Sequence, residues 1–463
     1  MEERCSGCTR RVCNQCRRNG RPVICGSKVK TVILPEAFGR DAADGGGGVA
    51  FDIGTTTVGG ILWNLSTGRQ EAAYVANNPQ GMHGGDVVSR IAFALVSKEN
   101  QCHLQQLIIG CLNGMLAQMQ QILPVHRIVI VGNPAMCHLV AGLSPAGLAR
   151  APFVAAYEDI VVKTGADLGL LAAAAQVFVL PGIGGHVGAD MLSALTYVDK
   201  IRTAEDCIVM DIGTNGEIAL IRKHTTYVCS AAAGPALEGG AVTFGMSAAA
   251  GAIMGVRWCP GASPGTADLA LQIIGGGEPL GICGSGLISL LAVMLEMGVI
   301  DKTGYLFGRT EAVRAGVAAS ACRHLVEWEG EHAFLVYQSK TRQIVITAAD
   351  IRQLQLSKGA IRAAVAVLLK KNGLKESAIP AIYLAGAFGS VIPVKHAIKI
   401  GLLPDIAEEK IHFSGNAAGA GASMALLSAK TRRDMTEEAG RMKHLELAEE
   451  EMFQSLFIQY MAF

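Results

Sequence analysis

The residues best suited to chemistry lie in a short turn that the sequence contains twice. Asp52-Ile-Gly-Thr and Asp211-Ile-Gly-Thr each separate two apolar runs, which predicts a strand, a tight turn and a second strand. The glycine of each turn lets backbone amides approach a ligand closely, and the polar residues after it supply donors for a phosphate. The aspartate at the end of the first strand is suited to hold Mg²⁺ through water. Each turn therefore predicts a phosphate site with its own magnesium ligand.

The two aspartates are 159 residues apart, about the length of one domain. Repetition of a whole structural unit predicts two related lobes, whose turns hold one polyphosphate from both sides. We assign Asp52, Asp211, Glu217 and Glu238 to catalysis, with Asp52 and Asp211 as the Mg²⁺ ligands. The phosphate-binding residues assigned to the two turns are Gly54, Thr55, Thr56, Thr57, Gly213, Thr214, Asn215 and Gly216.

Three later glycine-rich loops extend this predicted site. Glu238 ends a Gly- and Pro-bounded loop that we expect to form a cleft floor, where it either positions water or Mg²⁺ or caps a helix. Gly284-Ser-Gly precedes a predicted helix, and helix N-termini attract anions. Gly386-Ala-Phe-Gly ends a strand and leaves room for a flat ring against the backbone. The further residues assigned to nucleotide binding are Gly234, Gly284, Ser285, Gly286, Gly386, Ala387, Phe388, Gly389 and Asn416.

A second kind of chemistry is indicated by cysteines near the start of the chain. Cys5, Cys8, Cys13 and Cys16 form two Cys-x-x-Cys pairs, and Cys25 follows. Ligation by thiolates alone selects zinc or an iron–sulfur cluster. The short gap between the pairs matches neither the zinc-ribbon gap of ~15–20 residues nor the bacterial ferredoxin run. We favour an iron–sulfur cluster over structural zinc or unligated redox thiols, with Cys25 either replacing one ligand or staying free.

The cysteine-rich segment differs in charge from the rest of the chain. Residues 1–30 carry a formal charge of +6, which leaves −5 for the remainder. A basic cap on an acidic body predicts docking to an acidic partner surface. The alternative is that the arginines balance the thiolates and keep a small metal module soluble. The four glycines that follow Asp41-Ala-Ala-Asp predict a flexible linker, which tethers this module and lets it move.

The composition restricts the class of protein. The chain has 463 residues, of which 50% are hydrophobic, enough for two or three domains with cores. A net charge of +1 gives no general attraction to nucleic acid. The longest apolar stretch, residues 168–183, is interrupted by Gln176, Pro181 and glycines, so no membrane span is expected. Thirteen cysteines behind a charged N-terminus without a signal peptide predict a reducing, cytoplasmic location.

Periodicity and turn residues predict an α/β chain with amphipathic helices over residues 86–98, 102–123 and 350–371. His138, at a helix start, is expected to be structural. The predicted segments are a cysteine-rich module (1–30), a glycine-rich linker (31–47), a first lobe (48–186), a second lobe (187–429) with a β-rich insert (302–346), and a C-terminal helical tail (430–463).

The motifs resemble those of a known superfamily. The two Asp-Ile-Gly-Thr turns and Leu-Ala-Gly-Ala-Phe-Gly resemble the actin-like ATPases, or ASKHA superfamily, which include sugar and acetate kinases, Hsp70 and actin. Longer strings are similar to one branch, the reductive activators of corrinoid proteins, and the similarity covers roughly residues 48–463. These strings occupy residues 132–136, 180–190, 211–217, 232–239 and 415–422.

The resemblance implies a two-lobed actin-like ATPase with duplicated ribonuclease H-like subdomains. It implies that the two turns are phosphate loops for ATP and Mg²⁺, and that the third lines the adenosine pocket. It further implies one-electron transfer from an iron–sulfur centre to a Co(II) corrinoid protein of a methyltransferase system, which regenerates Co(I). An upstream low-potential electron donor and a homodimer are also expected. Well-known members carry a plant-type [2Fe–2S] domain and a linker domain that this chain lacks, so its cluster type does not follow from the resemblance.

Three other functions remain open from the sequence. A small-molecule kinase would have no use for a cysteine module. A radical activase for dehydratases belongs to the same superfamily, but it usually mounts its cluster on cysteines within the nucleotide lobes. A non-catalytic ATP-dependent binding protein with a zinc cap would touch RNA through its arginines. Iron and sulfide content, with an electron paramagnetic resonance spectrum, would distinguish these functions.

Overall fold

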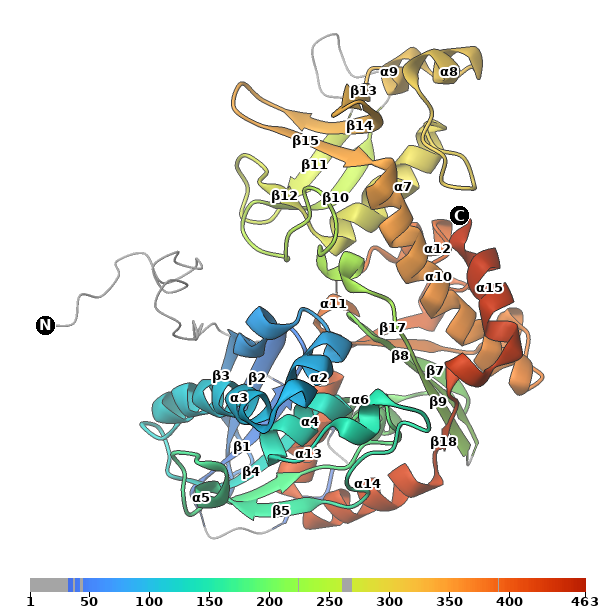
Figure 1. The fold of residues 1–463 in the computed structure, drawn as a ribbon. Helices are drawn as coiled ribbons and strands as arrows, with labels where there is room; N and C mark the ends of the chain where they lie inside the picture. Colours follow the sequence, from blue (N-terminus) through green and yellow to red (C-terminus); the bar gives the residue numbers. More distant parts are fainter. Residues whose placement is uncertain (1–31, 36–37, 42–44, 224, 260–268, 390) are drawn as a thin grey trace, which may run out of the picture. The chain divides into compact units, whose positions relative to one another are not determined.

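The computed structural model describes residues 32–35, 38–41, 45–223, 225–259, 269–389 and 391–463 (Figure 1). Its backbone contacts divide into two compact units. Unit 1 contains the residues up to Glu205, Ile221–Val228 and Ser414–Leu445, and unit 2 contains Asp206–Leu220, Cys229–Phe413 and Glu446–Phe463. The predicted cysteine module, with Cys5, Cys8, Cys13, Cys16 and Cys25, lies outside the described residues, as do parts of the predicted linker.

Unit 1 is built on a six-stranded sheet of order β3-β2-β1-β4-β6-β5. β1 (Gly47–Ile53) pairs antiparallel with β2 (Thr57–Asn64) and parallel with β4 (Val125–Gly132). β1 and β4 are almost entirely buried, which explains why their sequences are continuous apolar runs. The other strands are β3 (Gln70–Asn77), β5 (Val161–Thr164) and β6 (Gln176–Val179).

Side-chain caps set the ends of the helices in unit 1. Asp86 accepts a hydrogen bond from the Ser89 N–H, which starts α2 (Val87–Val96). Ser97 likewise caps α3 (Lys98–Met119), so this helix begins four residues before the predicted start and ends earlier. The remaining helices are η1 (Pro79–His83), α4 (Pro134–Ala141), η2 (Ala146–Ala149), α5 (Gly165–Leu168), α6 (Ala189–Ile201), α13 (Ala417–Leu427) and α14 (Ala429–Arg441).

His138, in α4, has a structural role, as expected. Its Nδ1–H donates to the Pro134 carbonyl at 2.6 Å, and its Nε2 accepts from the Ala156 N–H at 2.9 Å. Burial lowers the pKa of this imidazole. Because both ring nitrogens have backbone partners, the side chain holds the loop after α4 and has no nitrogen left for a ligand.

A second six-stranded sheet has the order β17-β16-β7-β8-β9-β18. Its middle strand β7 (Cys207–Ile212) lies between β8 (Gly216–Arg222) and the parallel strand β16 (Ile382–Ala385). Read from the other edge, the strands β9-β8-β7-β16-β17 correspond to β3-β2-β1-β4-β6 of the first sheet. The repetition expected from the two turns therefore extends to the strand order. Its other strands are β9 (Thr225–Ala231), β17 (Ile411–Gly415) and β18 (Lys443–His444).

Unit 2 contains two three-stranded sheets, β11-β10-β12 and β13-β14-β15. Residues 302–346, expected to be β-rich, contain two short helices besides these last strands. The strands of the two sheets and these two helices are β10 (Ala252–Trp258), β11 (Leu269–Ile273), β12 (Gly281–Ile282), β13 (Leu325–Trp328), β14 (Glu331–Gln338), β15 (Gln343–Thr347), α8 (Arg309–Arg314) and α9 (Ala319–Cys322).

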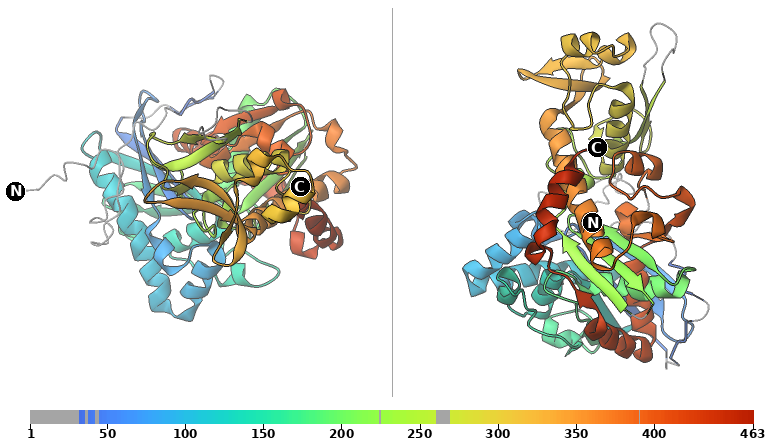
Figure 2. Two further views of the ribbon diagram at one scale, coloured as in Figure 1. Left: turned by 90° about the horizontal axis from the view of Figure 1, so that it is seen from above. Right: turned by 90° about the vertical axis from the view of Figure 1, so that its right-hand side faces the viewer.

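The long helix α10 (Ala348–Lys371) starts at a capping box formed by Thr347 and Asp350. Helix α15 (Glu451–Met461) lies alongside it, orange and red in Figures 1 and 2. The predicted C-terminal tail therefore forms two helices, α14 and α15. The other helices of unit 2 are η3 (Pro235–Glu238), α7 (Gly284–Met297), η4 (Glu376–Ala378), α11 (Gly386–Gly389), α12 (Val394–Lys399), η5 (Glu408–Lys410) and η6 (Leu447–Glu449).

The observed units differ from the predicted lobes because α6 and α13 both belong to unit 1. Every residue of α13 is buried, and the helix consists largely of alanine and glycine. These small residues allow close packing against α6: a Cβ on Gly421 would lie 2.0 Å from the Ser193 carbonyl oxygen. In the part of the chain that the structure describes, no helix is both long and apolar enough to cross a membrane.

We expect Gly421→Ala to destabilise the protein by about 1–3 kcal/mol, because the added methyl group forces α13 and α6 apart. Gly440→Ala is the matched control, since a Cβ there meets nothing within 4 Å. The same substitution in α14 is expected to stabilise by roughly 0.5–1 kcal/mol through helix propensity. Urea unfolding of both variants measures the difference. A Gly421→Ala variant as stable as the wild type would contradict this account of the packing.

Candidate functional site

The first turn lies in unit 1 between β1 and β2. The Gly54 N–H donates to the Thr57 carbonyl at 2.9 Å and closes the turn. A Cβ on Gly54 would lie 2.9 Å from that same oxygen, which explains the glycine. Thr56 and Thr57 are exposed, whereas Asp52 and Thr55 are half-buried. The turn therefore presents hydroxyl and amide groups at the surface of unit 1, beside a carboxylate.

Two residues that were not among the assigned site residues lie beside this turn. Asn133 follows β4 and caps α4, and its Nδ2 donates to the Thr55 hydroxyl at 3.0 Å. Asp190, in the first turn of α6, and Asp52 both raise the pKa of the Cys137 thiol, after the larger effect of burial. Both carboxylates are therefore close to Cys137. The signal available in the sequence was a polar residue directly after a buried parallel strand.

The second turn lies in unit 2 and is held from outside its hairpin. The Gly213 N–H donates to the Asn215 carbonyl at 3.1 Å, and the Gly234 N–H donates to the Thr214 carbonyl at 3.0 Å. The Thr214 N–H donates to Glu238 Oε1 at 3.1 Å. Thr214 itself is only 6% exposed. The loop that carries Gly234 and Glu238 thus packs directly against the Asp-Ile-Gly-Thr turn, as a cleft floor would.

Asp211 has an unusual environment at the end of β7. It pairs with Ala385 in the neighbouring strand, and a Cβ on the next residue, Gly386, would lie 2.4 Å from its Oδ1. Gly386 has φ +79°, so both its backbone conformation and its neighbour require glycine. Burial, and then the charge of Glu238, raise the pKa of Asp211 to about 6.

The pair formed by Asp211 and Glu238 fits a magnesium ion. Two carboxylates that repel each other in a partly enclosed place are stabilised by a divalent cation, and Mg²⁺ takes one or two carboxylates together with water and phosphate oxygens. Among the described residues, no three His, Cys, Asp or Glu side chains are arranged to bind a metal. The two carboxylates fit Mg²⁺ bound together with water and phosphate oxygens.

Three of the other predicted residues lie at close contacts within unit 2. Gly284 and Gly286 lie in the first turn of α7, where the helix packs closely against neighbouring backbone. A Cβ on Gly284 would lie 1.7 Å from the Leu237 carbonyl oxygen, and a Cβ on Gly286 would lie 2.0 Å from the Ile253 carbonyl oxygen. Ser285 is 2% exposed, with its hydroxyl 3.3 Å from the Cys283 thiol.

Other predicted residues lie as follows. Phe388 is half-buried and would meet a Cβ on Gly284, and Gly389 is buried. The Ala387 side chain lies outside the described part of the chain. Glu217 is buried in β8. Asn416 caps α13 through the Gly419 N–H at 2.9 Å and belongs to unit 1.

Comparison with known proteins decides the family. A model of the RACo middle region matches residues 47–201, and a model of the C-terminal domain of RACo, the ASKHA domain, matches residues 205–463. The corrinoid activation enzyme RamQ of Eubacterium limosum is 34% identical over 417 residues, which are 88% of this chain and 68% of RamQ. The chain belongs to the RACo family of reductive activators.

Other comparisons agree with this RACo assignment. The [Co(II) methylated amine-specific corrinoid protein] reductase of Methanosarcina barkeri is 27% identical over 440 residues, 89% of this chain and 76% of that protein. The solved structure of a reductive activator for corrinoid, iron–sulfur protein is 32% identical with a TM-score of 0.79, and covers 91% of this chain and 67% of the other. The predicted family, the α/β actin-like fold class and the assignment as an enzyme are therefore confirmed.

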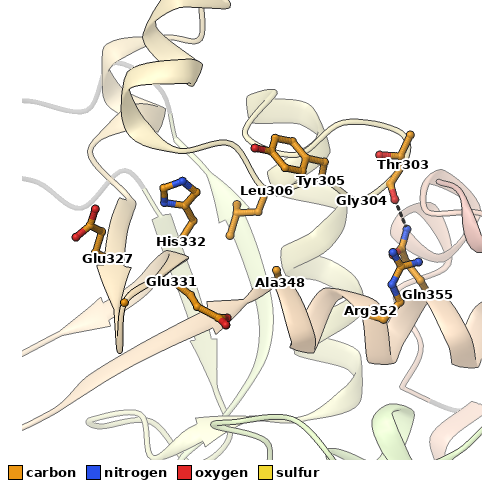
Figure 3. A pocket seen from close by; sticks show the side chains of 11 residues that line it. Thr303, Gly304, Tyr305, Leu306, Glu327, Glu331, His332, Ala348, Arg352 and Gln355 are labelled. Atoms are coloured by element: carbon orange, nitrogen blue, oxygen red, sulfur yellow. Dashed lines mark hydrogen bonds between the residues drawn. The ribbon is translucent and has the colours of Figure 1, made fainter.

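Unit 2 of this RACo-family chain has a further concavity, of about 570 Å³, which no predicted site residue lines (Figure 3). Figure 3 shows Glu327 and His332 at one side and Arg352 at the other, with Gln355 donating to the Thr303 carbonyl at 2.7 Å. Its mixed charges favour no single class of ligand. The lining residues are Thr303, Gly304, Tyr305, Leu306, Glu327, Gly330, Glu331, His332, Ala348, Arg352 and Gln355.

The raised pKa of Asp211 gives a prediction about stability. Because the folded state binds this proton more tightly than the unfolded state, Asp211 lowers the stability of the RACo-family fold as pH rises from about 4 to 6. Asp211→Asn is therefore expected to stabilise the protein at pH 7.5 by on the order of 1–3 kcal/mol. Below about pH 4 the difference disappears, because both side chains are then neutral. Urea unfolding at several pH values measures it.

Asp167→Asn is the control, because the pKa of Asp167 is shifted in the opposite direction from that of Asp211. Hydrogen bonds from the Thr164 backbone and hydroxyl lower the pKa of Asp167, so its contribution is present at neutral pH and is lost in acid. Asp167→Asn should therefore be less stable than the wild type at pH 7.5. If Asp211→Asn were also less stable than the wild type at pH 7.5, the explanation that burial and Glu238 disfavour the Asp211 carboxylate would be wrong.

Proposed function

We propose that this protein uses ATP to drive the one-electron reduction of Co(II) in a corrinoid protein to Co(I). The observation that carries the proposal is that the two RACo-family models together match residues 47–201 and 205–463. The named relatives are a corrinoid activation enzyme and a corrinoid protein reductase. The two turns add the chemistry, since each combines phosphate donors with an aspartate. A corrinoid protein is accordingly the proposed partner.

In unit 2, Asp211 would hold Mg²⁺, and the turn formed by Gly213, Thr214, Asn215 and Gly216 would lie against the phosphate. Glu238 is the proposed general base: its carboxylate is fixed by the Thr214 N–H and is close enough to Asp211 to shift that residue's pKa. It takes a proton from the attacking water, whose oxygen bonds to the γ-phosphorus as the bond to ADP breaks. We prefer it to Glu217, which is 5% exposed within β8.

In unit 1, we propose that Asp52 acts as a magnesium ligand and that Thr55, Thr56 and Thr57 donate to phosphate oxygens. Gly386–Gly389 of unit 2 are proposed to lie against the adenine ring, because Gly386 brings the backbone close to Asp211 without a side chain. That both turns hold one nucleotide stays a prediction. Variants in either turn should then raise the KM for ATP.

The electron route is proposed from the sequence. Cys5, Cys8, Cys13, Cys16 and Cys25 supply more than the four thiolates that an iron–sulfur cluster requires, and they lie outside the described residues. An iron–sulfur cluster bound there supplies one-electron transfer, which zinc does not. Reduction of Co(II) consumes one electron, which an external low-potential donor must replace. Each 59 mV of mismatch changes the one-electron equilibrium by about tenfold, so ATP must favour the conformation in which reduction is easier. We also propose that two copies of this chain form a homodimer.

We expect Glu238→Gln to lower kcat for ATP hydrolysis by about 100-fold or more with little change in KM, because the amide cannot accept the proton. Glu217→Gln is the matched control and should keep kcat within about threefold of the wild type. Phosphate release under steady-state conditions gives both parameters. A loss of kcat confined to Glu217→Gln would exchange the two roles.

The electron route is tested by anaerobic reduction of a Co(II) corrinoid protein, followed by the cobalt absorption spectrum. Cys5→Ser/Cys8→Ser should abolish ATP-dependent Co(I) formation and remove most of the iron, while ATP hydrolysis continues. Cys102→Ser/Cys259→Ser is the control with two thiols outside the module, of which Cys259 is exposed. Undiminished Co(I) formation by the Cys5/Cys8 variant would eliminate the module as the electron carrier.

A further inference from the structure

Arg90 is the largest fully buried side chain of the described residues, with 1% of its surface exposed. It points inward from α2 and makes three contacts. Its Nη2 donates to the Thr55 carbonyl at 2.5 Å, its Nε donates to the Gly84 carbonyl at 2.9 Å, and its Nη1 lies 3.4 Å from the Met136 sulfur. Arg90 therefore connects the first Asp-Ile-Gly-Thr turn to the loop before α2.

The carbonyls of Gly54, Thr55 and Thr56 in the turn accept hydrogen bonds from outside the β1–β2 hairpin. Besides Arg90 at Thr55, the Asn78 side chain donates to the Gly54 carbonyl at 2.9 Å, and the Asn78 N–H donates to the Thr56 carbonyl at 2.8 Å. Fixing three successive carbonyls also fixes the orientation of the peptide N–H groups between them. The donors that a phosphate would meet are thereby held in place before it binds.

The Arg90 charge has little compensation. Within the described part of the chain, no carboxylate lies within ion-pair distance of the guanidinium. Burial lowers the pKa of Arg90 to about 10, and the charge of Asp86 opposes this, so the side chain stays protonated at neutral pH. A buried cation held only by carbonyl oxygens and a sulfur is costly unless an anion binds nearby.

We propose that Arg90 is a positioning residue for the nucleotide: it fixes the Thr55 carbonyl and places a positive charge beneath the turn that receives phosphate. This inference rests on the proposed function, because it takes the Thr55–Thr57 turn to be a phosphate site. The ligand chemistry is a polyphosphate, and Arg90 acts on it through the turn, without touching it. Asn78 completes the anchoring of the turn through the Gly54 and Thr56 carbonyls.

The test compares two variants of Arg90 and one variant of Asn78 with a distant control. Arg90→Met removes the charge and all three contacts, whereas Arg90→Lys keeps the charge but loses the planar fork of donors. Asn78→Ala removes one anchor without touching the charge. Arg432→Met is the control, because Arg432 is also buried, at 7% exposure, and donates to the Ala425 carbonyl at 2.6 Å, with its guanidinium over the Phe178 ring. Calorimetry with MgATP and hydrogen exchange of the amides of residues 53–58 are measured for each protein.

We expect Arg90→Met to weaken MgATP binding at least tenfold and to speed exchange in the turn. Arg90→Lys should recover part of the binding but not the exchange protection, and Arg432→Met should bind MgATP within about twofold of the wild type. Equal weakening by Arg90→Met and Arg432→Met, or unchanged exchange in the turn, would overturn the role of Arg90. Wild-type protein that does not bind MgATP would instead overturn the proposed function, while the exchange experiment would still test the anchoring.

Discussion

The carboxylates of Asp211 and Glu238 repel each other at the end of β7, and the packing of unit 2 keeps them together. Asp211 is enclosed by the strand pair β7–β16 and by Gly386. Because Gly386 has no side chain, its backbone lies close to the Asp211 carboxylate. Glu238 is held by the Thr214 N–H. A divalent cation relieves this repulsion, so the fold holds a site that is unfavourable until it is filled.

The first turn, in unit 1, is also held from outside its hairpin, but by different residues. There the turn after β1 is held by Asn78, Arg90 and Asn133, which belong to the loop before η1, to α2 and to the cap of α4. In unit 2 the anchors are Glu238 and Gly234, from the loop around η3. The hairpins are alike in sequence because each needs the same tight turn. Their supports differ because each turn is surrounded by different elements of its own unit.

The sequence was sufficient to predict the parts of this site that depend on local contacts. The two turns and their glycines follow from hydrogen bonds between residues at most a few positions apart, such as Gly54 with Thr57. Arg90 could not be predicted, because its role depends on a contact 35 positions away, and an arginine in an apolar helix looks like a surface residue. The unit that contains α13 differs from the predicted lobe for a related reason. A helix of alanine and glycine can pack against many surfaces, and its packing on α6 depends on close approaches such as that between Gly421 and Ser193.

The most direct test of the account is the number of protons released when MgATP binds at pH 6. Cation binding should lower the pKa of Asp211 from about 6 and release about half a proton. Calorimetry in buffers of different ionisation enthalpy gives this number. The account predicts release by the wild type at pH 6, much less at pH 8, and none from Asp211→Asn at either pH. Tight MgATP binding without proton release at pH 6, or equal release from Asp211→Asn, would contradict a magnesium site at the second turn.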